Sequence, residues 1–135
     1  MLDNVIMVIF VIFLILMVSF TAAVGIIMFG QWCAVQNQAQ FVAESMGKWG
    51  GYTTDADRAM REFADRINVS KSRIDIEVSN VYPVPWGTPV WVRLYVPFNF
   101  SVGNVNVGRY TLEGVGRSVS SYMPGSGYSA SYVYP

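Results

Sequence analysis

Asp75 and Glu77 are the acidic pair whose spacing is best suited to chemistry. They alternate with Ile74, Ile76 and Val78, so a strand over this stretch places both carboxylates on one face. Two neighbouring carboxylates can bind Ca²⁺ or work as an acid–base pair. The alternative is an ordinary strand surface that faces solvent, and we favour this simpler interpretation.

The residue types on which most enzymes rely are absent from the sequence. The chain has no histidine, the commonest acid–base group and metal ligand, and its single cysteine, Cys33, excludes a C-x-x-C motif and an internal disulfide. No G-x-S-x-G, P-loop or G-x-G-x-x-G sequence occurs. We interpret Cys33 as a small apolar residue in helix packing, with pairing between chains as the alternative. We expect a protein that is not an enzyme, with no catalytic, cofactor-binding or metal-binding residues.

Charge and aromatic content limit the classes of partner. Nine basic and nine acidic residues give a net charge of zero, so no basic surface is available and we expect no direct binding of nucleic acid.

Aromatic residues make up 15% of the chain, and several tyrosines lie close together near its C-terminal end. A sugar-binding platform or a stacking conduit is one interpretation; packing in subunit interfaces is the one we favour. These residues are Tyr122, Tyr128, Tyr132 and Tyr134.

The longest feature of the sequence is an apolar segment over residues 5–30. It carries no charge, and only Ser19 and Thr21 interrupt its apolar residues and glycines. As a helix it is about 39 Å long, which exceeds the roughly 30 Å core of a bilayer. It is apolar on every side, so it needs cover all round. It lacks the basic start and short apolar region of a cleaved signal peptide, and we expect it to remain in the mature chain.

Small residues inside this segment indicate close helix packing. Ser19 and Ala23 are four residues apart, and so are Thr21 and Gly25, a spacing that lets helices approach closely. A glycine costs about 1 kcal/mol in an exposed helix, so either close packing or local melting of the helix would explain glycines here. We also expect the Asp3 carboxylate to form an ion pair with an N-terminal amine, its own or that of a neighbouring copy, in an apolar core. The predicted helix–helix assembly residues are Asp3, Ser19, Thr21, Ala23, Gly25 and Gly30.

Helical periodicity continues to residue 49, but with one apolar face. Polar residues recur every four positions on another face, where Glu44 and Lys48 have the favourable order for an ion pair. We predict one helix from about residue 3 to residue 49, ended by Gly50 and Gly51. The face predicted to dock on a globular domain consists of Trp32, Val35, Ala39, Val42, Met46 and Trp49.

The rest of the chain predicts a small mixed domain. Thr54 can cap a short second helix with Asp55 and Asp57 in its first turn. A period of two then predicts strands near residues 74–79, 90–96 and 105–119, the last with bends or bulges at its glycines, which are Gly108, Gly114 and Gly116.

The predicted fold class is α+β, with a long helix, a short second helix, about three antiparallel strands and an extended tail. The predicted organisation is a membrane or filament-core helix over residues 1–30, a helix continuation and globular domain over residues 31–123, and a Gly/Ser/Tyr-rich tail over residues 124–135.

These features together resemble the type IV pilin-like superfamily, and most closely the TadE-like pseudopilins of tight-adherence systems. The resemblance rests on the apolar segment followed by FGQWCAVQNQAQFVAESMGKWGGYT, RIDIEVS, PVWVRLYVPF and LEGVGRSVSSYMPG. Type IV pilins usually carry a glutamate at the fifth position, which pairs with a neighbouring N-terminal amine during assembly. This chain has Val5 there, and Asp3 is the only acid nearby.

The resemblance implies a structural subunit of a pilus-like filament, or fimbrium. Its partners would be copies of itself in a helical polymer, the membrane before assembly, and an assembly machinery. It would reside in the inner, or cytoplasmic, membrane and then in an extracellular filament on the cell surface. The alternative is a minor pseudopilin, or a bitopic membrane component of a secretion or conjugation apparatus.

Overall fold

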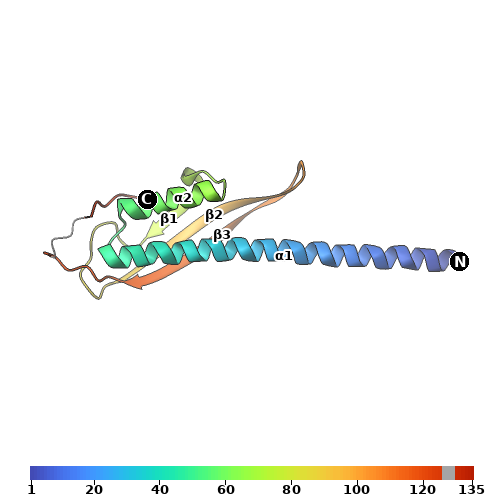
Figure 1. Cartoon of the computed structure of the whole chain (residues 1–135), viewed down its shortest axis with the longest axis horizontal. Helices are drawn as coiled ribbons and strands as arrows, with labels where there is room; N and C mark the ends of the chain where they lie inside the picture. The colour runs from blue at the N-terminus through green and yellow to red at the C-terminus, as the bar shows by residue number, and fades with distance from the viewer. Residues whose placement is uncertain (126–129) are drawn as a thin grey trace. The chain divides into compact units, whose positions relative to one another are not determined.

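The computed structural model describes residues 1–125 and 130–135, with the backbone alone at positions 102 and 107. The fold is α+β, as predicted, and comprises two compact units, Met1–Gln31 and Trp32–Pro135. The elements in chain order are α1 (Leu2–Trp49), α2 (Thr54–Arg66), the 3₁₀ turn η1 (Lys71–Arg73), β1 (Asp75–Val78), β2 (Pro89–Val102) and β3 (Val105–Val119) (Figure 1).

Helix α1 is continuous over Leu2–Trp49, which confirms the predicted helix. It contains no proline, and Asp3 lies in its first turn and Lys48 in its last, where the helix dipole favours each charge. It ends where Gly50 adopts a φ of 79°, a left-handed conformation that glycine accepts without strain. The Tyr132 hydroxyl donates to the Trp49 carbonyl at 2.7 Å and so satisfies one of the last helical acceptors.

Helix α2 is capped by Thr53 rather than by Thr54, which corrects the sequence-based prediction. The Thr53 side chain accepts a hydrogen bond from the Ala56 N–H at 3.3 Å. Thr54 is already the first helical residue, and both its N–H and its hydroxyl donate to the Ser131 carbonyl, at 2.8 and 3.1 Å. Two adjacent threonines offer the same capping chemistry, and the returning tail decides which of them caps the helix.

The sheet is antiparallel, with the order β1-β2-β3, and β1 is much the shortest strand. Its first residue, Asp75, lies opposite Tyr95 on β2. The next residue of β2 whose backbone faces the same side is Pro97, which has no N–H to donate. The pairing of β1 with β2 therefore ends before Pro97, because this residue has no N–H to donate to a neighbouring strand.

One face of the sheet carries the core of the unit Trp32–Pro135. The other face is solvated and holds Asp75 and Glu77, both exposed. The Arg93 guanidinium lies 5.1 Å from the Trp91 ring centroid on that solvated side. Side chains from α1, α2 and the strands share the core, and its fully buried members include Val35, Ala39, Val42, Met46, Met60, Val92, Leu94 and Val96.

Candidate functional site

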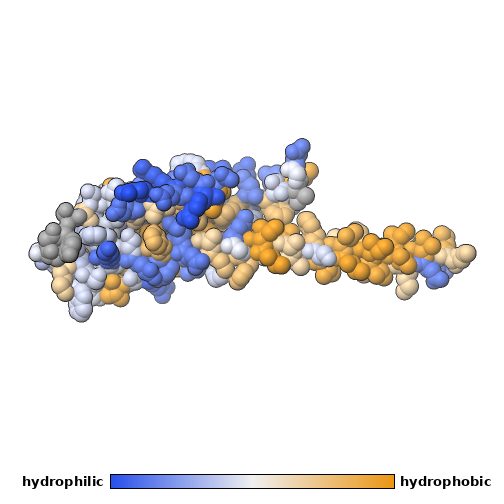
Figure 2. All heavy atoms as spheres, viewed as in Figure 1, coloured by the Kyte–Doolittle hydropathy of each residue, from blue (hydrophilic) through white to orange (hydrophobic). Residues whose placement is uncertain are grey.

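The candidate functional surface is the apolar part of α1 within the unit Met1–Gln31, because this part of the helix is exposed. Among the described residues, α1 is the one helix long and apolar enough to cross a membrane. Figure 2 shows orange, hydrophobic atoms along most of this unit. Side chains on every side of the helix are exposed, for example Leu14 at 45%, Ile15 at 59% and Leu16 at 63%. This unit therefore presents a continuous apolar surface to its surroundings.

The six predicted assembly residues all lie on exposed surface of this helix. The Thr21 hydroxyl donates to the Met17 carbonyl at 2.9 Å, so its polarity is satisfied inside the helix. At Gly25 and Gly30 an added Cβ would meet no described atom within 4 Å, apart from the chain neighbours and the nearby backbone of the helix itself. Packing within the described part of the chain therefore gives no reason for glycine at these two positions, although each destabilises an isolated helix by about 1 kcal/mol relative to alanine.

The predicted docking face of α1 divides into a buried middle and two outer tryptophans. Val35, Ala39, Val42 and Met46 are each 0% exposed in the core. Trp32 is 43% exposed, and Trp49 is half-buried with the Lys48 ammonium 5.3 Å from its ring centroid. The middle of the face fixes this part of α1 on the domain.

Two glycines of β3 let the helix lie very close to the sheet. A Cβ added at Gly114 would be 2.8 Å from the Val35 carbonyl oxygen, and one at Gly116 would be 2.1 Å from the Ala39 carbonyl oxygen. The register of β2 and β3 shifts once, between Phe100 and Ser101, which lie opposite Gly108 and Asn106. The bulge predicted at Gly108 is therefore found beside that glycine, whereas Gly114 and Gly116 lie in regular register. Close backbone approach explains these glycines instead.

Two glutamines of α1 complete the open edge of β3. Gln36 donates from Nε2 to the Val115 carbonyl at 2.6 Å and accepts from the Val115 N–H at 3.1 Å. Gln40 does the same at Arg117, at 3.1 and 3.3 Å. Four residues of helix rise about 6 Å, and two residues of strand about 6.6 Å, so the two amides match two successive outward-facing peptide units.

Replacing both Gln36 and Gln40 with leucine should weaken this attachment. Four hydrogen bonds disappear at a partly solvated edge, so we expect the free energy of unfolding to fall by about 1–3 kcal/mol in total. The exposed edge of β3 should also promote association through strand pairing. Urea unfolding in detergent, followed by tryptophan fluorescence, measures the first effect, and light scattering measures the second.

The matched control for this pair is Asn37→Leu. Asn37 is an exposed amide on the same helix, outside the glutamine contacts with β3. The same change of side-chain type there should leave stability within about 0.5 kcal/mol. Equal losses from Asn37→Leu and from the glutamine variants would show that the contacts with β3 contribute nothing.

Asp57 is a buried charged residue of α2. The sequence predicted only its place in the first turn of this helix and not its burial. Its Oδ1 atom accepts from the Tyr52 hydroxyl at 3.1 Å and from the Lys71 ammonium, and its Oδ2 lies 3.1 Å from the Arg61 guanidinium. Burial and the Asp57 carboxylate raise the pKa of Tyr52, so this hydroxyl stays protonated and remains a donor. The cluster is fully paired, and it joins the segment that follows α1 to α2 and η1.

The remaining chemical candidates do not converge on a reactive centre. Cys33 is a free, half-buried thiol. Over residues 1–125 and 130–135, no group of three or more Cys, Asp or Glu side chains is placed to hold a metal ion. Of the terminal tyrosines, Tyr132 donates to α1, and Tyr134 packs edge-on against Tyr82 with ring centroids 6.2 Å apart. Tyr128 lies outside the described residues.

Comparison with known proteins gave no match for this chain among family models, curated proteins or solved structures.

Proposed function

We propose that this chain is a structural pilin subunit that polymerises through its N-terminal hydrophobic helix into an extracellular filament. The observation that carries the proposal is the apolar surface of residues 5–30, exposed on every side. A helix about 10 Å wide and about 39 Å long has a lateral surface on the order of 1,200 Å². The largest apolar patch on a typical soluble monomer is only about 300–600 Å².

Such a surface needs either lipid or other copies of the chain as its cover. A helix that is apolar all round is buried equally well by both. The glycines at positions 25 and 30, which no contact among the described residues requires, favour a second helix as the final partner. The membrane then holds the chain before assembly, and copies of the chain replace lipid in the filament core. The proposed role is structural, with no catalysis, and it relies on an assembly machinery that moves the helix out of the membrane.

The alternative is a minor pseudopilin, or a permanent bitopic membrane component, of a secretion or conjugation apparatus. Its support is the same helix, which is long enough to span a bilayer. The two proposals differ in where the protein accumulates. A filament subunit should be the dominant protein of fibres at the cell surface, whereas a bitopic component should stay with the membrane.

Shearing of cells that express the native chain separates these outcomes. We expect thin fibres by electron microscopy in the sheared fraction, with this chain as their main protein by mass spectrometry. Recovery of the chain only in the membrane fraction, with no fibres, would contradict the filament proposal and favour the bitopic alternative.

A further inference from the structure

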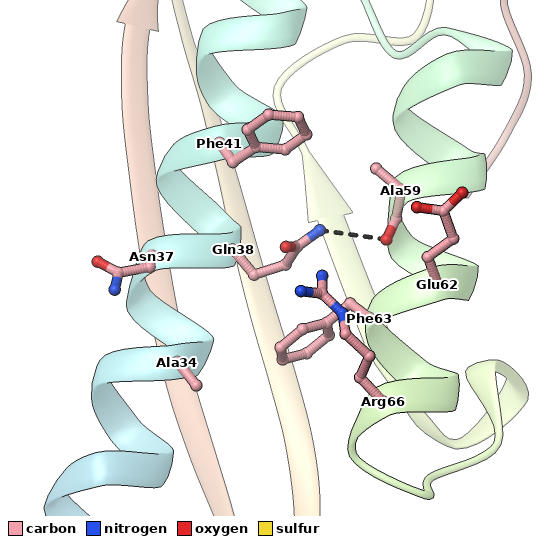
Figure 3. A pocket seen from close by; sticks show the side chains of 8 residues that line it. All are labelled: Ala34, Asn37, Gln38, Phe41, Ala59, Glu62, Phe63 and Arg66. Carbon is pink, nitrogen blue, oxygen red and sulfur yellow. Dashed lines mark hydrogen bonds between the residues drawn. The ribbon is translucent and has the colours of Figure 1, made fainter.

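A groove of about 530 Å³ lies between α1 and α2 in the unit Trp32–Pro135 (Figure 3). Two small side chains, Ala34 on α1 and Ala59 on α2, leave room between the helices. Phe63 lines the groove as a buried residue, 4% exposed, while Phe41 lines it from α1 and remains 55% exposed. A large aromatic side chain beside an open hollow is an apolar surface that a partner could cover.

One buried polar side chain, Gln38, lies in this groove and is only 8% exposed. Its two hydrogen bonds are both donated by Nε2, to the Ala59 carbonyl at 3.4 Å and to the Met60 sulfur at 3.6 Å. The first is long, and the second has a thioether sulfur as its acceptor, so both are weak. Among the described side chains no fully buried nitrogen or oxygen lacks a partner, so the Oε1 atom of Gln38, a residue that lines the groove, is at least partly accessible. It is an acceptor to which a group inside the groove can donate.

The charges of the groove favour an uncharged occupant. One acid, Glu62, and one base, Arg66, line it from α2, and both are exposed. They cancel, so neither an anion nor a cation is preferred. Their aliphatic stems can lie along an apolar partner while the charged ends stay in water. The groove thus suits an apolar helix that carries small residues and one hydroxyl donor.

We propose that this groove receives the apolar helix of a second copy of the chain, with Ser19 and Ala23 facing Gln38. The inference rests on the proposed filament and names its contact. Residues 5–30 are uncharged and exposed, as the groove requires. Their two hydroxyls differ: Thr21 is bonded to its own helix, whereas Ser19 makes no such bond within the described part of the chain.

Ser19 therefore donates to the Oε1 atom of Gln38, and Ala23, one turn further along, lies against the small residues of the groove. A helix of one copy in the groove of the next is a head-to-tail contact between two different surfaces. Such a contact generates a fibre when its repetition does not close into a ring, as the proposed filament requires.

Cross-linking between differently tagged copies tests this contact in assembled fibres. Both copies carry Cys33→Ser, which removes the one native cysteine. One copy carries Ala23→Cys and the other Ala59→Cys, and a short bis-maleimide reagent is added to sheared fibres. We expect a mixed dimer that carries both tags. The control pair replaces Ala59→Cys with Thr111→Cys, an exposed position on β3 away from the groove, and should give no mixed dimer.

The hydrogen bond has a separate readout. Ser19→Ala and Gln38→Met should each reduce the yield of mixed dimer by about 2- to 10-fold, the range for one hydrogen bond. Both changes together should reduce it no further than Gln38→Met alone, because that variant has already lost the bond to Ser19 together with the bonds of Gln38 to Ala59 and Met60. Fold reductions that multiply in the double variant would refute the Ser19–Gln38 contact.

The outcomes also separate this inference from the proposed function. Fibres that form but give no mixed dimer from Ala23→Cys and Ala59→Cys would overturn the groove contact and leave the filament proposal standing. A mixed dimer from the control pair in equal yield would overturn it too, since contact would then be unspecific. Absence of fibres from the native chain would overturn both.

Discussion

Gly25→Leu is expected to remove surface fibres while the variant still accumulates in the membrane. Beyond its own helical turn, no described atom lies within 4 Å of a Cβ added at Gly25, so the substitution meets no clash in the described part of the subunit. Leucine is a better helix former than glycine by about 0.8 kcal/mol, and it inserts readily into lipid. Only a closely packed neighbouring helix would be obstructed.

The expected loss of fibres from Gly25→Leu is large because the same unfavourable contact recurs at every subunit of a fibre. Extra bulk in a packed interface costs typically about 1–3 kcal/mol, and every subunit of a filament would bear that cost. We expect the yield of sheared fibres to fall at least about tenfold, because 1.4 kcal/mol corresponds to a factor of ten. Immunoblots of the sheared and membrane fractions measure both quantities in one experiment.

Two further variants show whether bulk at Gly25 is responsible. Ile26→Leu places a leucine on the neighbouring residue, which is 72% exposed, without adding volume. It should assemble like the native chain. Gly25→Ala adds one methyl group and should give an intermediate yield. Normal fibre yield from Gly25→Leu would argue against close packing of helices at this position and, with it, against the proposed filament core.

The helices and strands of this protein could be predicted from sequence because their signals are local. The continuous α1 follows from an apolar run without proline and then an amphipathic pattern, and the strands follow from a period of two. The contacts between these elements were harder to foresee. Gln36 and Gln40 have the spacing of an ordinary polar helix face, and only the position of β3 beside α1 makes them partners of its edge.

The candidate site also combines features that the sequence shows with features that depend on the fold. The apolar segment and its small residues are visible in the sequence, because hydrophobicity and spacing need no knowledge of the fold. Gln38 gave no signal of its own, since its meaning depends on the two helices that form the groove around it. Asp57 was expected only as a first-turn acid, and its partner Lys71, fourteen positions on, becomes a neighbour only after folding. Glycine is the residue whose role was hardest to assign, because bulges and close approach both require it.

Gly116→Ala should therefore be among the most destabilising single changes in the domain. An added Cβ would lie 2.1 Å from the carbonyl oxygen and 2.4 Å from the carbonyl carbon of Ala39, and 2.8 Å from the Ala43 side chain. The first two contacts are with helix backbone, which cannot rotate away, so α1 must move off the sheet. We expect the free energy of unfolding to fall by about 3 kcal/mol or more, measured by urea unfolding in detergent with tryptophan fluorescence.

Gly108 provides the matched control on the same strand. An added Cβ there meets no atom within 4 Å, and its φ is not positive, so Gly108→Ala should leave stability unchanged within about 0.5 kcal/mol. The difference between the two variants measures how much stability depends on the close approach of α1 to β3. Because that approach also fixes the helix that lines the groove, Gly116→Ala should lose the mixed dimer of the cross-linking experiment, and Gly108→Ala should keep it. Equal stability of the two variants would show that α1 does not lie as close to β3 as the structure places it.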